Sequence, residues 1–439
     1  MANWLHSLIF SRSAWWALCL LVLIGCGGDI CNTLENGSVD LRNRVVGARL
    51  LAAGADPYRY TWQAGEPETF LDPISQRART PENRVSVSPG ALAIYAVFSD
   101  FHYRSQQLIW LVLQWAAALG TVFLLANSIP QTMDRRFLIM LIALFFLTGE
   151  SWRFHVERGQ IYVFYALVLA ASYRLDRMRF RFSDFSGGVL MGMGVLLRPT
   201  FIFVSIPFLI SKRWRVLVGG LCGILLGMMA IAPFANLPAW RSYVSGMESI
   251  GHFYLRTSGV SEGLSLEEDL PQSVEGMRNL SKAKRFDVSP VRLYAVTFLA
   301  PPFARSFLLK CGGLIFILAF SILLWRCWKP DQPLETSWII GITLMMGADF
   351  FLPAPRQAYN NIIWCVPLGL LIIQEGASEL FRGKAGWVLG IGLLIACGVI
   401  HASALDTLGL ANLVVTIFFM MTSLRLASGA GSKEYYEPS

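Results

Sequence analysis

The chain has 439 residues, of which 37 are Lys or Arg and 29 are Asp or Glu, so its formal net charge is +8. Hydrophobic residues make up 54% of the chain and charged residues only 15%, against about 25% charged residues in soluble domains. This composition excludes a water-soluble globular protein, a coiled coil, a disordered chain and a nucleic-acid binder, and it predicts an integral membrane protein.

A helix needs roughly 20 apolar residues to cross the hydrocarbon core of a bilayer. The apolar segments, several of them short, predict an all-α polytopic membrane protein with about 12 transmembrane segments in a single domain, 1–439. In chain order they are 14–28, 106–127, 137–149, 160–173, 185–197, 199–211, 216–235, 306–325, 337–353, 361–374, 386–403 and 407–424. Two stretches, 29–104 and 236–304, are too polar to cross and are predicted to be large outer loops that carry amphipathic or re-entrant helices.

The basic residues of the short loops sort onto one side of the predicted bilayer. Arg12 precedes the first segment, which places the N-terminus in the cytoplasm, and the tail 425–439 then lies on the same side. The predicted cytoplasmic side holds sixteen basic residues, among them Arg177 and Arg425. The short outer loops hold only four, namely Arg153, Arg158, Arg198 and Arg356. The positive-inside rule supports this topology and accounts for much of the positive charge without an acidic partner.

Residues 185–211 are predicted to form a helical hairpin with Arg198-Pro199 at its apex. Both flanks are basic, and a single crossing would place one of them outside and invert every later loop. Each arm of about 13 residues reaches roughly 20 Å, short of a core about 30 Å thick. The apex is therefore expected at membrane depth, where an Arg is tolerated only against protein or a wet cavity. The short segment 137–149, which ends at Glu150, indicates the same outward-facing cavity.

The first outer loop begins with a predicted amphipathic helix on the outer membrane interface. Ser38 is a good N-cap for a helix that carries Asp40 in its first turn, and Gly54 is a natural stop. One face of this helix carries an apolar stripe, formed by Val45, Ala48, Leu51 and Ala52. Three arginines lie off the stripe: Arg42, Arg44 and Arg49. Helix capping is the alternative role for Asp40.

Three later stretches carry polar groups that could line a site. Ser88-Pro89 begins an apolar segment too short to cross, which predicts a re-entrant or interfacial helix. Residues 150–162 are charge-rich and fit a solvated loop, but Gln160 at the mouth of the next helix is a candidate contact. Asp349 ends an apolar segment, and an intramembrane carboxylate indicates either function or a partner for a nearby Arg.

The eight cysteines form no CxxC motif and no Cys/His cluster. We therefore expect buried small hydrophobic residues and neither a disulfide framework nor a metal site. The segment that ends in Leu23-Ile-Gly-Cys26 also fits a lipoprotein cleavage box, but a first transmembrane helix is the favoured interpretation because a single Arg precedes it.

Taken together, these stretches resemble the polyprenol-phosphate-sugar-dependent glycosyltransferases of the GT-C superfamily. Within it they resemble the bacterial GT87 type, which includes mannosyltransferases of cell-envelope glycolipids. The matching motifs run in order along the chain: Asp40, Ala48, Gly54 and Pro57-Tyr58, then Ser88-Pro89, Gly159-Gln160, Arg198-Pro199, Lys212-Arg-Trp-Arg215, and Pro355 to Pro367.

The resemblance implies a GT-C-like fold and transfer of a hexosyl or pentosyl unit, with inversion, on the periplasmic face of the bacterial inner membrane. It places the general base at Asp40, whose pKa partial burial would raise toward the useful range. Because guanidinium groups pair well with phosphate, the leaving phosphate is assigned to Arg158 and Arg198, with Arg356 third.

Sugar or acceptor contacts by analogy with the family are Gln160, Tyr359 and Asn360. Some family members carry a His in the late motif where this chain has Asn360 and Asn361. Asn can bond a sugar hydroxyl but cannot take up a proton at neutral pH, so the role of that His is not carried over.

The expected partners are a polyprenyl-phosphate-linked sugar, a glycolipid or glycan acceptor and the bilayer. No nucleic acid is expected from the apolar composition, and no cofactor or metal is expected because the sequence has no P-loop, no dinucleotide fingerprint and no carboxylate or His cluster. Mannose and arabinofuranose are both open as the sugar. One alternative is a transporter or flippase for lipid-linked sugars, although no repeated halves are evident. The other is a ligase or polymerase that moves an oligosaccharide from a lipid diphosphate.

Overall fold

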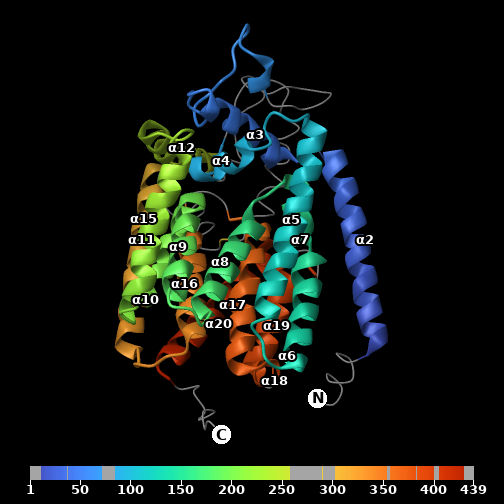
Figure 1. Cartoon of the computed structure of the whole chain (residues 1–439), viewed down its shortest axis with the longest axis vertical. Helices are drawn as coiled ribbons and strands as arrows, with labels where there is room; N and C mark the ends of the chain where they lie inside the picture. The colour runs from blue at the N-terminus through green and yellow to red at the C-terminus, as the bar shows by residue number, and fades with distance from the viewer. Residues whose placement is uncertain are drawn as a thin grey trace.

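The computed structural model describes residues 11–36, 38–71, 85–257, 289, 302–352, 356–381, 383–399 and 405–429. Over these residues the protein is helical and contains no β-strand. The long helices stand side by side as a bundle, and three helices lie across one end of it (Figure 1). These three are α3 (Val39–Ala52), α4 (Pro89–Ala96) and α12 (Leu237–Thr257).

Every predicted apolar segment contains helix. The bundle elements are α2 (Arg12–Asn36), α5 (Tyr103–Ala126), α6 (Thr132–Ile142), the π-helical η2 (Ala143–Leu147), α7 (Glu150–Arg158), α8 (Tyr162–Arg177), α9 (Ser183–Leu197), η3 (Pro199–Ser205), α10 (Ile206–Ile210), α11 (Trp214–Ile231), α15 (Pro302–Cys327), α16 (Leu334–Ala348), η5 (Asp349–Phe351), η6 (Ala358–Trp364), α17 (Cys365–Glu375), α18 (Ala377–Leu380), α19 (Lys384–Ala396) and α20 (Leu405–Ala427). The short η1 (Glu68–Phe70) lies in the first outer loop.

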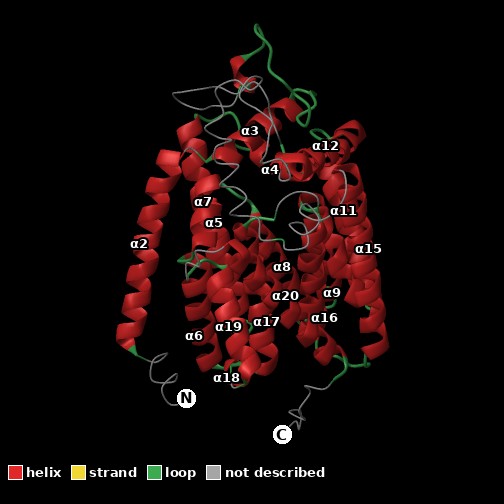
Figure 2. Ribbon diagram, turned by 180° about the vertical axis from the view of Figure 1, so that it is seen from behind, coloured by secondary structure: helices red, strands yellow, loops and turns green. Residues whose placement is uncertain are grey.

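Several of these helices are too short to cross a membrane unaided. Among the described residues, five helices are long and apolar enough to do so, or six if α6–η2 and α7, which are bent by 57°, form one span. The apolar helices α9 and α19 fall below that length. The structure therefore supports a helical membrane protein and does not confirm a count of twelve spans. Figure 2 shows α2 at the edge of the bundle, in keeping with its small buried share of 6%.

The segment 185–211 turns back on itself at Arg198, as the hairpin prediction requires. At its open end, Arg215 lies 4.0 Å from Asp184, and Arg213 bonds the Asp176 carboxylate at 2.7 Å. The first arm packs tightly on α11, because a Cβ atom at Gly188 would lie 2.1 Å from the Val216 carbonyl oxygen. Such small residues allow two helix backbones to approach closely.

The basic loops assigned to the cytoplasm gather at one end of the bundle. Arg177 donates to the Ser128 carbonyl at 2.8 Å and lies 3.4 Å from Glu335. Arg425 pairs with Glu375 at the same end. This clustering is what a positive inner surface requires, while the side of the membrane that it faces stays a prediction.

Helix α3 is buried more deeply than an interfacial helix with one apolar stripe. Val45 and Arg44 are both buried, although Arg44 was placed off the stripe, and Ala52 is exposed. Ser38 occupies the N-cap position, but it is left-handed (φ 45°) and its side chain makes no cap bond, so that part of the prediction was wrong. Packing against α4 and contacts with α7 cover a second side of the helix.

Ser88 connects the start of α4 to the C-terminal end of α9, which stops at Leu197 just before the hairpin apex. Its hydroxyl accepts from the Ala91 amide at 3.2 Å, as the helix-start prediction requires, and lies 2.5 Å from the Leu196 carbonyl oxygen. Carbonyls at the end of a helix have no partner within that helix. Ser88 therefore caps one helix at its start and another at its end.

We expect Ser88→Ala to lower the free energy of unfolding by about 1–3 kcal/mol, because it removes the cap and leaves a buried carbonyl unpaired. Thermal unfolding in detergent measures this loss. Ser205→Ala is the matched control, since that exposed hydroxyl bonds only the Ile202 carbonyl of its own turn. Equal shifts in the two variants would show that the Ser88 contact adds no stability.

Two other expectations meet the described structure only in part. All eight cysteines are free, but only Cys365 and Cys397 are buried; Cys19 and Cys31 are exposed on α2, so the expectation of general burial was wrong. An apolar segment can face either the interior of the helix bundle or the lipid, and the sequence does not show which of the two surrounds a given cysteine. Most of the second outer loop, 258–288 and 290–301, and the tail beyond 429 lie outside the described residues.

Candidate active site

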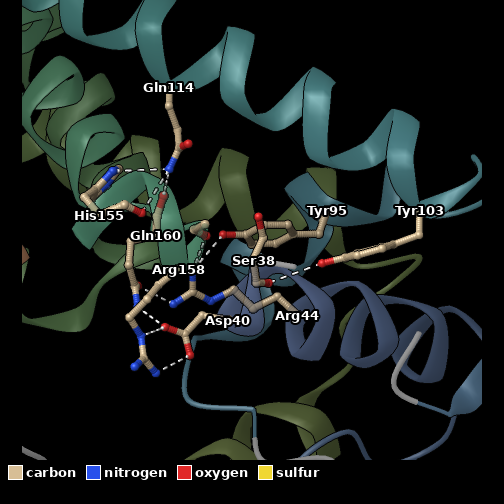
Figure 3. A network of polar contacts seen from close by, with 10 residues as sticks. Ser38, Asp40, Arg44, Tyr95, Tyr103, Gln114, His155, Arg158 and Gln160 are labelled. Carbon is tan, nitrogen blue, oxygen red and sulfur yellow. Dashed lines mark hydrogen bonds and ion pairs between the residues drawn. The ribbon is translucent and has the colours of Figure 1, made fainter. Parts of the chain in front are cut away.

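Asp40 is held between two side chains from the region around the end of α7. Arg158 binds the carboxylate in a bidentate manner: Nε donates to Oδ2 at 2.7 Å and Nη2 donates to Oδ1 at 3.2 Å. Gln160 Nε2 donates a second, short hydrogen bond to Oδ2. Figure 3 shows the three side chains converging beneath the start of α3. The sequence brought these residues together only through motif order, and the structure places them in contact.

Gly159 makes this contact possible. It ends α7 in the left-handed conformation (φ 67°), which favours glycine. The main-chain N–H of Gln160 then donates to the His155 main-chain carbonyl at 2.9 Å. A Cβ atom at Gly159 would lie 2.7 Å from Cβ of Leu41, so α3 could not approach as closely. The Gly-Gln pair therefore both ends the helix and delivers Gln160 to Asp40.

The pKa of Asp40 shifts in the opposite direction to the sequence prediction. Burial alone raises the pKa of this carboxyl, but the charge and hydrogen bonds of Arg158 lower it, and Arg44 and Arg42 add to the lowering. The net pKa lies below the usual value. The prediction considered burial, which is the largest single influence on this pKa, and left out the arginines, whose combined lowering outweighs it.

A second charged cluster surrounds Asp349. Arg198 Nη2 donates to its Oδ2 at 2.5 Å, and Arg356 Nη1 lies 3.8 Å from the same oxygen. All three residues are buried. Asp349 thus pairs with a nearby Arg, which is one of the two interpretations that the sequence left open for it. Two guanidinium groups share one carboxylate, and the cluster carries one excess positive charge. Within the described structure, Arg198 Nη1 and Arg356 Nε have no hydrogen-bond partner.

An aromatic wall connects the two charged clusters. The Arg198 guanidinium lies 5.0 Å from the Tyr162 ring centre, and the Tyr162 ring lies 5.0 Å from that of Tyr359. Tyr359 stacks on Phe154 at 5.9 Å, and Arg158 lies 5.5 Å from the Phe154 ring centre. The candidate residues thus belong to one continuous region, and cations near aromatic faces are favourably placed.

The late motif, residues 355–367, supplies Arg356 and Tyr359 to this region, and its two asparagines follow in η6. Asn361 is tied into the bundle, because its amide donates to the Ala396 carbonyl at 2.7 Å. Asn360 is buried, and its Oδ1 has no partner among the described residues. Neither residue bonds Asp40. In the described part of the chain, no three His, Cys, Asp or Glu residues come together as a metal site.

Sequence reasoning missed a buried polar layer beneath Asp40. Residues 150–158 form a helix with a buried face rather than a solvated loop, and His155 is fully buried on it. The helical spacing of Trp152, His155 and Val156 was the available signal. Arg44 was also missed, although it stands four residues after Asp40 and hence on the same helix face.

A family model for glycosyltransferase family 87 matches residues 88–355, which is more than half of the chain. The match spans Ser88, Arg158, Gln160, Arg198 and Asp349. Asp40, Arg356, Tyr359 and Asn360 lie outside it. A search of curated proteins finds no match.

Proposed function

The chain belongs to glycosyltransferase family 87 and is therefore a membrane glycosyltransferase, and from this premise we propose its reaction. The enzyme transfers one monosaccharide from a polyprenyl-phosphate donor to a hydroxyl of a lipid or glycan acceptor. The reaction takes place on the periplasmic face of a bacterial inner membrane, at the end of the bundle that α3 and α4 cover. The observation that carries the proposal is the Asp40 carboxylate, held by Arg158 and Gln160 next to a second Arg cluster.

In this mechanism Asp40 accepts the proton of the acceptor hydroxyl as its oxygen attacks the anomeric carbon. The bond from that carbon to the phosphate oxygen breaks, and the phosphate leaves with the electron pair. Attack opposite the leaving group inverts the anomeric centre. Arg198 and Arg356 stabilise the charge that grows on the phosphate, for which their unpartnered guanidinium nitrogens are suited. Tyr359 and Asn360 contact the sugar or the acceptor.

Arg158 has two roles in this proposal. In the structure it neutralises Asp40, and an Asp with a lowered pKa is a weak base. A donor phosphate competes for the same guanidinium, because phosphate and carboxylate both fit its bidentate geometry. Donor binding therefore releases Asp40 and makes it more basic at the time when the acceptor arrives. This order avoids proton uptake before a donor is bound.

We expect the acid limb of kcat/KM to lie at a lower pH than an ordinary aspartate would give, since Arg158, Arg44 and Arg42 lower the pKa of Asp40 in the free enzyme. The carboxylate is charged above this limb and is lost as a base when the pH falls through it. Arg158→Gln removes the main cause of the lowering, so the limb should move to higher pH. A pH series of initial rates measures the shift. An unmoved limb would mean that Asp40 is not the titrating base.

The direct test is transfer by the purified protein in nanodiscs. A panel of radiolabelled polyprenyl-phosphate monosaccharides, including mannose and arabinofuranose, is offered with a total lipid extract as acceptor. Label should appear in a new lipid or glycan with the wild type and not with Asp40→Asn. Passage of lipid-linked sugar across liposomes without any transfer would favour the flippase instead, and transfer from a lipid diphosphate alone would favour the ligase.

A further inference from the structure

We propose that Arg44 is a positioning residue, which fixes the amide of Gln160 and through it aims the carboxylate of Asp40. This inference rests on the proposed function, because it treats Asp40 as the base. Arg44 stands one helical turn after Asp40 on α3 and is 5% exposed. A charged side chain is almost never buried to this degree without defined partners.

Each contact of Arg44 is directed at the α7–α8 junction or at α4. Nη1 donates to the Gly159 carbonyl at 2.9 Å, and Nη2 donates to Gln160 Oε1 at 2.6 Å. Nη1 also lies 3.3 Å from the Tyr95 hydroxyl, below α4. One guanidinium therefore joins three elements at the point where Asp40 is held (Figure 3).

These contacts determine which way the Gln160 amide faces. Arginine has donors and no acceptor, so the atom of Gln160 that faces Arg44 must be its oxygen. The amide nitrogen then faces Asp40 Oδ2 and can only donate to it. The main-chain carbonyl of Gln160 is held separately, because Gln114 Nε2 donates to it at 2.9 Å. Without Arg44, the Gln160 amide could rotate and present its oxygen to the carboxylate, which would repel it.

This orientation also distinguishes the two oxygens of Asp40. Oδ2 accepts from both Arg158 and Gln160, whereas Oδ1 accepts from Arg158 alone among the described contacts. When the donor phosphate draws Arg158 away, Gln160 still holds Oδ2. The geometry then leaves Oδ1 as the oxygen that receives the acceptor's proton.

Arg44 also supplies a charge that stays in place. The charged or titratable groups that act on Asp40 come from α3, α4, α7 and η6: Arg42, Arg44, Tyr95, Arg158 and Tyr359. Once Arg158 has turned to the donor, Arg44 leaves a positive charge near the partly buried carboxylate of Asp40. Asp40 then gains basicity without becoming neutral before the acceptor binds.

The test compares Arg44→Met, Gln160→Met and the double variant in the full-length protein in nanodiscs. Each single variant should lower kcat roughly 10- to 100-fold through misplacement of the base, with little change in the KM for the donor. Because Arg44 acts through Gln160, the double variant should be no slower than the slower single variant. Additive losses, or a change confined to KM, would overturn the proposal.

Arg49→Met is the matched control on the same helix. Arg49 is partly buried and bonds the Ser99 and Thr69 backbone carbonyls, away from Asp40. Its loss should lower thermal stability and leave kcat unchanged. Arg44→Lys is a second variant in case Arg44→Met does not fold. It keeps the positive charge but lacks the planar guanidinium that bonds Gly159 and Gln160 together. Its kcat should fall between those of the wild type and Gln160→Met. A wild-type kcat in Arg44→Lys would show that charge alone suffices and overturn the positioning role.

A readout that needs no turnover separates this proposal from the proposed function. Infrared difference titration of protein carrying ¹³C-labelled aspartate, with Asp40→Asn as the reference, follows protonation of Asp40 directly. Arg44→Met should raise the pH at which Asp40 protonates, and Arg49→Met should not. Failure of the wild type to transfer any sugar would refute the proposed function, whereas an unshifted titration in Arg44→Met would refute the link from Arg44 to Asp40.

Discussion

Asp40→Asn is expected to abolish sugar transfer, with a loss in kcat of roughly 100- to 10,000-fold, the range that a positioned general base contributes. Asn has the size of Asp and still accepts a hydrogen bond, but it cannot take the acceptor's proton. The variant also frees Arg158 from its ion pair. Donor affinity should therefore stay the same or increase while turnover is lost. Filter binding of the labelled donor, beside initial rates, measures the two effects separately.

Glu150→Gln is the control for this prediction. Glu150 is a carboxylate in the first turn of α7, and the described structure shows no bond between it and Asp40. Its neutralisation should leave kcat within a few-fold of the wild type. If Asp40→Asn turns over normally and Glu150→Gln does not, Asp40 serves only the start of α3, and Glu150 takes its place as the base.

The helical segments could be predicted from the sequence because hydropathy and loop charge report directly on the membrane. The hairpin at Arg198 illustrates this, since two basic flanks required a return and the structure brings Arg215 back to Asp184. The number of full crossings could not be predicted. Short helices such as α9 are buried against other helices, and an apolar run looks the same whether protein or lipid surrounds it.

The candidate site was predictable as a set of residues and not as a set of contacts. Motif order named Asp40, Arg158 and Gln160, but no pattern told that Arg158 would pair with Asp40 and lower its pKa. The contact joins residues 118 positions apart, and such long-range pairing leaves no periodic signal. Arg44 could have been found from its i,i+4 spacing to Asp40, had the helix been expected to lie buried on more than one side.

Arg198→Gln is expected to weaken donor binding at least 10-fold and to destabilise the protein. Arg198 is 8% exposed, and its ion pair with Asp349 is buried. Removal of one partner from a buried pair costs about 3–5 kcal/mol, because the other charge is left uncompensated. Arg356 stays 3.8 Å from Asp349 and should offset part of that cost. A loss of donor binding alone therefore does not separate a phosphate contact from a structural ion pair.

The variant Asp349→Asn makes this separation. It keeps both guanidinium groups and removes the carboxylate that they share, so it should lower the midpoint of thermal unfolding at least as much as Arg198→Gln does. Donor binding should be lost less than in Arg198→Gln, because the guanidinium that faces the phosphate is still present. If Asp349→Asn loses as much donor affinity as Arg198→Gln, Arg198 acts only by balancing Asp349, and the phosphate site must be built from Arg158 and Arg356. If stability falls and affinity is kept, Arg198 itself contacts the anion that arrives with the lipid.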